Sequence, residues 1–352
     1  MENQKIVSAI SLLAGCSSPS EATLEGKNCL IDLHLHLDGS ISVVSAKKLA
    51  KMQGITIPEG EALVKLLSVS EDCKDLNEYL EKFAFPVSLL QTKEAISASV
   101  YNLMEELKAE GLIYAEIRFA PQKHKEQGLT QEEVIQAAID GLNRSSLKGG
   151  LILCCMREKG NLAENLETVS LASQYLGKGV LAVDLAGAEA LYPTGNFEEV
   201  FTLAKELGVP YTIHAGEAAG AESVRTAVDF GAPRIGHGVR STEDGELLKI
   251  LAAKGIVLEC CPTSNLQTCV YDSIEEYPVR TFFDAGVKFT INTDNITVSA
   301  TSLRNEWNKI IKAFHLTEDE VKEILLHSAD ASFADKEVKE DLRSIIETEF
   351  KK

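Results

Sequence analysis

The sequence of 352 residues contains no cluster of lysine and arginine, no long apolar run and no C-x-x-C pair. Its 53 acidic residues outnumber its 35 lysine and arginine residues, which gives a formal net charge of −18 at pH 7. This charge repels nucleic-acid phosphate and anionic membranes, so we expect a neutral or cationic small molecule as partner and no nucleic acid. No stretch reaches the roughly 20 apolar residues of a membrane span, so no transmembrane segment is expected.

The eight cysteines are not spaced as in zinc ribbons or thioredoxin-type redox sites. Two adjacent pairs, Cys154–Cys155 and Cys260–Cys261, fall within apolar runs that are typical of strands. These positions predict buried, reduced thiols. The pattern therefore favours a cytoplasmic location.

The first 28 residues differ in character from the rest of the chain. Their apolar stretch ends in "LLAGC" and is followed by Ser and Pro, which resembles a bacterial lipoprotein signal with Cys16 as the lipidated residue. Glu2, however, cancels Lys5 where such a signal should be net positive. We expect residues 1–28 to form a short helix and a linker, with a lipid anchor at Cys16 on the cell surface as the alternative.

From Cys29 onward, short apolar runs alternate with longer segments whose apolar residues recur at helical spacing and end at a glycine. Eight such strand-and-helix units predict an α/β fold, a TIM (β/α)8 barrel that occupies residues 29–352 as a single domain. The expected strands are 29–37, 112–121, 150–157, 179–187, 209–217, 232–238, 255–265 and 286–295.

The connection between the first two expected strands is unusually long and contains helical patterns of its own. A long excursion from the C-terminal rim of a barrel commonly forms a lid or a pocket wall. We therefore expect extra helices after the first strand. Candidate apolar contacts for a planar ligand in this segment, with ordinary helix packing as the alternative for each, are Leu76, Tyr79, Phe83 and Phe85.

Histidine is scarce, yet four of the seven histidines fall at expected strand ends. His34 and His36 lie two residues apart in "IDLHLHLDGS", so a strand places both side chains on one face. Chemistry in a barrel takes place at the C-terminal ends of the strands. Further polar or glycine residues at these ends are Asp184, Gly187, His214, Glu217, His237, Asp294 and Asn295, whereas His124, His315 and His327 fall in loop or helical sequence and are read as surface or packing residues.

Three imidazoles and one carboxylate make a suitable ligand set for zinc, which keeps a further position for water in catalytic sites. The ligands would be His34, His36, His214 and Asp294. Glu217 is then close enough to move protons, and His237 could orient or deprotonate the attacking water. The alternative is that Glu217 and His237 only hold the ligands by hydrogen bonds.

Six motifs in a fixed order resemble the adenosine deaminase family of the amidohydrolase superfamily: "HLHLDGS", "DLAGAE", "TIHAGE", "RIGHG", "CPTSN" and "TDN", from residue 34 to 295. The resemblance implies hydrolytic deamination of adenosine and 2′-deoxyadenosine to inosine and 2′-deoxyinosine, with release of ammonia. It implies one zinc ion per chain on the four ligands named above. It also implies that Glu217 protonates N1 of the purine, that His237 lies beside the attacking water, and that Asp294 both binds zinc and accepts a hydrogen bond from that water.

The same resemblance assigns the substrate contacts to His36, Asp38, Gly187 and Asn295. Asp38 would meet the ribose, the backbone N–H of Gly187 would meet N3, and Asn295 would donate to N7. Because a carboxylate near the 5′-hydroxyl repels phosphate, a nucleoside is expected as substrate rather than a nucleotide.

The sequence departs from the family pattern at two positions. Asn295 stands where many relatives have aspartate; its amide can still donate a hydrogen bond to N7. Ala188 stands where many relatives also have aspartate, which puts the local support of Gly187 in question.

Two other functions are compatible with these residues. One is deamination of another 6-aminopurine, such as adenine or a neutral 5′-modified adenosine. The other is metal-dependent binding of nucleosides without turnover. The polynucleotide deaminases use a P-C-x-x-C zinc motif that this sequence lacks.

Overall fold

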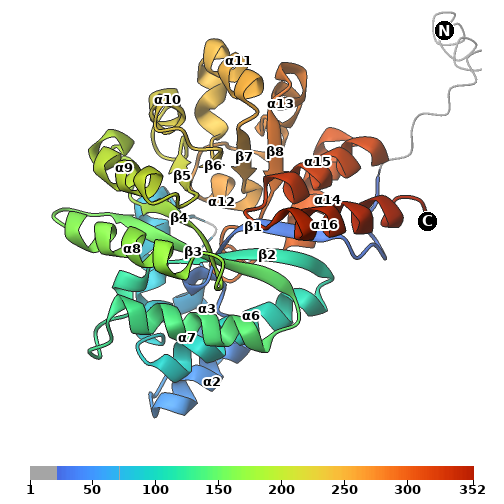
Figure 1. Cartoon of the computed structure of the whole chain (residues 1–352). Coiled ribbons are helices and arrows are strands. Elements are labelled where there is room, and N and C mark those ends of the chain that lie inside the picture. The colour runs from blue at the N-terminus through green and yellow to red at the C-terminus, as the bar shows by residue number, and fades with distance from the viewer. Residues whose placement is uncertain (1–21, 71) are drawn as a thin grey trace, which may run out of the picture.

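The computed structural model of the chain describes residues 22–70 and 72–352. The expected N-terminal helix and the alternative anchor at Cys16 fall mainly on residues 1–21, outside the described part. Figure 1 shows parallel strands in the middle of the molecule with helices around them. No helix in the described part of the chain is long and apolar enough to cross a membrane.

All eight expected strands are present, so the sequence prediction of the strands is confirmed. The seventh strand stops earlier than expected because Pro262, which suits the first turn of a helix, begins α12 (Pro262–Gln267). The strands are β1 (Leu30–His36), β2 (Leu112–Phe119), β3 (Lys148–Arg157), β4 (Val180–Gly187), β5 (Thr212–Ala215), β6 (Arg234–His237), β7 (Val257–Cys260) and β8 (Lys288–Ile291).

Backbone hydrogen bonds close the strands into a barrel. The order β1-β2-β3-β4 is parallel throughout, and so is β5-β6-β7-β8. The Val183 N–H donates to Pro210 O at 2.9 Å and joins the two halves on one side. On the other side, Asp294 N–H donates to His34 O at 2.8 Å, and His36 N–H donates to Asp294 O at 2.7 Å. This second junction brings Asp294, three residues beyond the end of β8, beside both histidines of β1.

The helices of the barrel present apolar stripes to the strands, as their sequence periodicity predicts. In α7 the stripe follows a capping box made by Thr130 and Glu133, which fixes where the helix begins. The outer helices are α6 (Lys93–Ala109), α7 (Gln131–Arg144), α8 (Leu162–Tyr175), α9 (Glu198–Glu206), α10 (Ala221–Asp229), α11 (Gly245–Lys254), α13 (Val279–Ala285), α14 (Leu303–Phe314), α15 (Glu318–Ala331) and α16 (Lys336–Glu349).

The long connection between β1 and β2 forms the expected extra helices, namely α2 (Val43–Gln53), α3 (Glu61–Leu67), α4 (Leu76–Leu80) and α5 (Ala84–Ser88), before α6. Several hydrogen bonds tie this insertion to the loop that follows β8. The hydroxyl of buried Tyr79 lies 2.7 Å from Ser299 Oγ, and Val69 N–H donates to Val298 O at 3.0 Å. The insertion therefore covers the same end of the barrel as Asp294.

The two adjacent cysteine pairs lie in or next to β3 and β7, and all four thiols are buried, as expected from the sequence. Burial raises the pKa of Cys155 and holds Cys154 and Cys261 well above their usual range. These thiols are therefore protonated and unreactive at neutral pH.

Candidate active site

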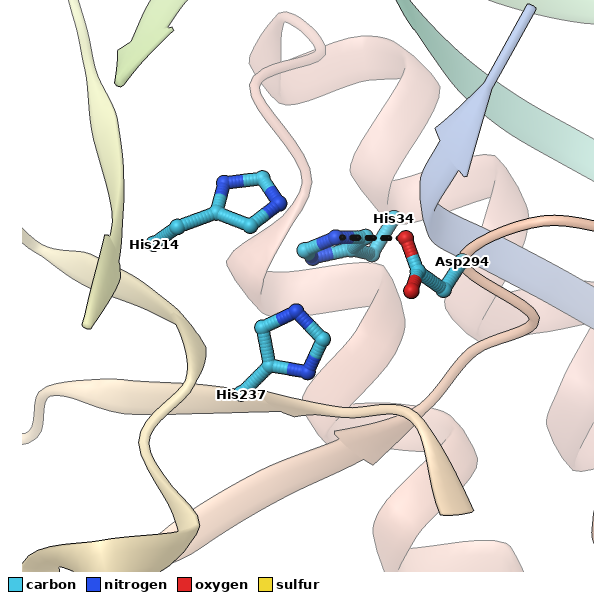
Figure 2. A group of neighbouring side chains, drawn as sticks. All are labelled: His34, His214, His237 and Asp294. Carbon is cyan, nitrogen blue, oxygen red and sulfur yellow. Dashed lines mark ion pairs between the residues drawn. The ribbon is translucent and has the colours of Figure 1, made fainter. Parts of the chain in front are cut away.

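Four predicted metal ligands converge at the C-terminal end of the barrel. His34 and His36 lie two residues apart in β1, so both rings point to the C-terminal end of the barrel. His214 of β5 and Asp294, which follows β8, approach them there. His36 Nε2 lies 3.2 Å from His214 Nε2 and 3.3 Å from Asp294 Oδ1. His34 Nε2 lies 3.4 Å from the same carboxylate oxygen, the contact drawn as a dashed line in Figure 2.

This arrangement fits a divalent cation. Buried His34 Nε2 has no hydrogen bond within residues 22–70 and 72–352, and its contact with Asp294 is longer than an ordinary hydrogen bond. Two imidazole nitrogens that face one another at 3.2 Å need either a shared proton or a common positive partner. Nitrogen and carboxylate oxygen are the donors that zinc prefers. The donor atoms of the four side chains therefore lie close enough together for a metal ion, and their role as ligands stays a prediction.

His237 also reaches this cluster. Ligand atoms of His34, His214, His237 and Asp294 all lie within 4.8 Å of one another, and Figure 2 shows the His237 ring aimed at the same centre. Geometry alone therefore allows two ligand sets, one with His36 and one with His237.

The hydrogen bonds of His237 distinguish the two sets. Asn265 Oδ1 accepts from the Tyr277 hydroxyl at 2.9 Å, so its Nδ2 faces His237 Nδ1 at 3.1 Å as a donor. A neutral ring that accepts at Nδ1 carries its proton on Nε2, which leaves no lone pair there for a metal. His237 Nε2 points instead toward Glu217 Oε2, 3.5 Å away. We therefore favour the set that contains His36. Sequence reasoning did not identify Asn265, although it lies in the "CPTSN" motif.

Three fully buried charged residues contact the side of the proposed ligands that faces the barrel interior. His34 Nδ1 lies 2.7 Å from Glu259 Oε2, and His214 Nδ1 lies 2.8 Å from Asp184 Oδ2. Arg118 donates to both carboxylates at 2.8 Å. With their protons on Nδ1, the two rings present the free Nε2 lone pairs to the centre of the site. Sequence reasoning missed Arg118 and Glu259; the signal was a charge inside each of two apolar strand sequences.

Asp184 was predicted only as a strand-end residue, and the structure gives it a supporting role. Burial would raise its pKa, but the charges of His214 and Arg118 hold the pKa well below the usual range, so the carboxylate is ionised. We expect Asp184→Asn to weaken zinc affinity about 10–100-fold, because the amide holds the imidazole less firmly. Competition with a chromogenic chelator would measure this loss on protein whose thermal unfolding is checked in parallel. Asp244→Asn, at the N-cap of α11, is the matched control, and equal affinity in both variants would contradict the assignment.

Glu217 follows β5 in a turn that one carboxylate organises. Glu189 accepts hydrogen bonds from the backbone N–H groups of residues 216–219, at 2.7 to 3.0 Å. Burial raises the pKa of Glu217 well above its usual value, and the charges of Asp294 and Glu189 raise it further. This direction favours the carboxylic acid form of Glu217, which can donate a proton. Sequence reasoning missed Glu189, which follows the strand β4 within "DLAGAE".

A cavity of about 650 Å³ opens above these groups, large enough for a nucleoside-sized ligand. Three of the four apolar candidates from the insertion line it, namely Leu76, Tyr79 and Phe83. Phe85 does not; it packs against the main core instead. The one-turn helix α5 directs Ala84 and Val87, at i and i+3, to the cavity, so Phe85 faces the other way.

The predicted substrate contacts also line the cavity. Asp38 is almost fully buried, has an oxygen without a hydrogen bond within the described residues, and has a pKa raised by burial to about 7. Gly187 has φ of +108°, a conformation that favours glycine. Asn295 packs so closely on Gly39 that a Cβ there would lie 1.8 Å from Asn295 Oδ1. Ala188, the second departure, holds the turn after Gly187 through its carbonyl, which accepts from two backbone N–H groups.

Known proteins resemble this chain over nearly its whole length. The family model described as adenosine deaminase matches residues 29–349. An adenosine deaminase of Haemophilus ducreyi is 49% identical over 331 residues, which are 91% of this chain and 96% of the relative. Among solved structures, an adenine deaminase from Arthrobacter aurescens has a TM-score of 0.84 at 24% identity, covering 92% of this chain and 100% of its own. An Arabidopsis N6-methyl-AMP deaminase has a TM-score of 0.80 at 26% identity, covering 90% and 97%.

Proposed function

Because this chain belongs to the adenosine deaminase family, we propose that it hydrolyses adenosine and 2′-deoxyadenosine to inosine and 2′-deoxyinosine, with release of ammonia. The observation that carries the proposal is the convergence of imidazole and carboxylate donors beside the buried carboxyl group of Glu217 on the floor of one cavity. The residues that would hold one zinc ion are His34, His36, His214 and Asp294. A zinc ion bound there would activate water for attack on C6 at neutral pH.

Glu217 and His237 have different roles in the proposed reaction. Glu217, held as a carboxylic acid, donates its proton to N1, so the ring can accept electron density when C6 is attacked. The Nε2–H of His237 orients the attacking oxygen, since its Nδ1 is occupied by the Asn265 amide. Glu217, now a carboxylate, accepts a proton from the attacking water oxygen and passes it to the departing amino group, which leaves as ammonia; the second proton of that water restores the carboxylic acid. The hydrogen bonds of Asn265 thus favour the orienting role of His237 over that of a base.

The groups beyond the reacting carbon support a nucleoside as substrate. Asp38 Oδ1, which has no hydrogen bond within the described residues, can accept from a ribose hydroxyl. The Gly187 N–H can meet N3, and the Asn295 amide can donate to N7. We propose a cytoplasmic enzyme of purine salvage; the buried thiols support this location.

Relative rates on adenosine, 2′-deoxyadenosine and adenine test the substrate assignment. We expect both nucleosides to release one ammonia per molecule and to react far faster than adenine, because the base alone leaves Asp38 buried without a partner. A higher kcat/KM for adenine would overturn the assignment in favour of a 6-aminopurine base. Tight binding of adenosine without ammonia release would show a nucleoside-binding protein.

A further inference from the structure

An ion pair that the chemistry above does not use lies at the rim of the cavity. Lys123 follows β2 and Glu158 follows β3, and the two side chains form a salt bridge while both line the cavity. Their side chains are 33% and 42% exposed, so the pair faces both solvent and the bound ligand. No other lysine is among the cavity-lining residues of the described chain.

The order of strands places this pair on the part of the rim between β1 and β4. His36 pairs with Arg118 across β1 and β2, and Arg157 pairs with Gly187 across β3 and β4. Around the rim, the pair therefore stands between Asp38 and Gly187, the groups assigned to ribose and N3. The proposed ligands and acid come from β1, β5 and the end of β8. A purine whose C6 faces those groups directs its sugar toward the sector that contains the pair.

Lys123 is also the partly exposed cation among the described cavity-lining residues, and its salt bridge is to one carboxylate, Glu158. The other cationic side chain in the lining, Arg157, is buried and donates to Tyr192 O, Thr194 Oγ1 and His214 O, at 2.6 to 3.0 Å. Those bonds fix Arg157 beneath the site. The charge that a ligand meets at the rim is therefore set by whether Glu158 neutralises Lys123.

Buried amides hold the two loops that carry the pair. Gln122 Nε2 donates to Asn165 Oδ1 at 2.8 Å, and Asn161 Nδ2 donates to Met156 O at 2.8 Å. The Lys123 carbonyl accepts from Gln91 Nε2 at 3.0 Å. These bonds hold the backbones of both loops in place. We therefore expect the backbone at Lys123 to keep its position when the charge of Glu158 is removed.

We propose that the Lys123–Glu158 pair is a specificity determinant that meets the 5′ end of the substrate, with Glu158 excluding 5′-phosphorylated nucleosides by neutralising Lys123. The inference rests on the proposed function and names a second residue, in addition to Asp38, that excludes nucleotides. The fold itself accommodates nucleotides, since the similar Arabidopsis protein is described as an N6-methyl-AMP deaminase. Removal of the Glu158 charge releases a lysine for a charge-assisted hydrogen bond to phosphate.

The test compares Glu158→Gln with the parent protein on three substrates: adenosine, adenosine 5′-monophosphate and 5′-amino-5′-deoxyadenosine. We expect kcat/KM for the monophosphate, relative to adenosine, to rise about tenfold, mostly through KM, and the ratio for the cationic amine to fall. Asp38 is unchanged in both proteins, so its repulsion cancels in this comparison. Chromatography must show inosine 5′-monophosphate as product, which excludes a contaminating phosphatase.

The chain offers a closely matched control. Lys125 and Glu164 form a neighbouring salt bridge of 2.7 Å with side chains 30% and 44% exposed, but neither residue lines the cavity. Glu164→Gln should leave both ratios unchanged, and adding Lys123→Gln to Glu158→Gln should remove the gain. Unchanged ratios in Glu158→Gln, or an equal gain in Glu164→Gln, would overturn the inference. Failure of all proteins on adenosine would instead overturn the proposed function.

Discussion

Replacement of Glu217 by glutamine is expected to lower kcat for adenosine by about 10²–10⁴-fold, the usual contribution of a positioned acid and base. The amide has nearly the same shape, and the turn that carries it is held by backbone hydrogen bonds to Glu189, so the fold should persist. The amide cannot supply a proton to N1, however. Steady-state kinetics on the zinc-loaded variant would measure the effect.

Two controls separate loss of the acid from loss of the site. Zinc content of Glu217→Gln should equal that of the parent, because the side chain is not among the proposed ligands. Glu222→Gln, an exposed carboxylate on the following helix, should keep the parental rate. A Glu217→Gln protein with the parental kcat would show that another group protonates the purine.

The second large effect is expected at Asp294, where removal of the carboxylate should deplete the protein of zinc and abolish turnover. Loss of a ligand should cost more metal affinity than the about 10–100-fold that loss of a supporting residue costs. Elemental analysis after gel filtration, together with the rate on adenosine, would measure both consequences.

The choice of substitution matters at this position because Asp294 has φ of +61°. Alanine is strained there by about 1–2 kcal/mol, whereas asparagine tolerates this region and keeps the shape. Asp294→Ala and Asp294→Asn should both lose metal, but only the alanine variant should also unfold at a lower temperature than the metal-free parent protein. Full zinc occupancy in folded Asp294→Asn would contradict the ligand assignment.

The barrel was predictable from the sequence because its signal is local. Each strand is a short apolar run, each helix carries its own periodicity and stop, and parallel order follows from their alternation. The proposed ligands could be named for a related reason. Histidine is scarce in this chain, and a barrel gathers the residues at its strand ends whatever their distance in sequence.

The supporting network could not be predicted in the same way. The charges of Arg118 and Glu259 stand in apolar runs, and nothing local shows that they face one another across the barrel. Glu189 likewise has its partners in a loop that follows the next strand. The two alternatives for Phe85, ligand contact and helix packing, could not be separated because a one-turn helix offers too little periodicity to tell its inner face from its outer face. Tertiary contacts decide all of these positions.

A zinc titration of metal-free protein, with adenosine consumption followed by ultraviolet absorbance, tests the central claim most directly. The account predicts no conversion in protein shown by elemental analysis to be free of metal. Activity should then rise in proportion to added zinc and level off at one ion per chain, with inosine and ammonia as products. Conversion at the full rate by the metal-free protein would contradict the account.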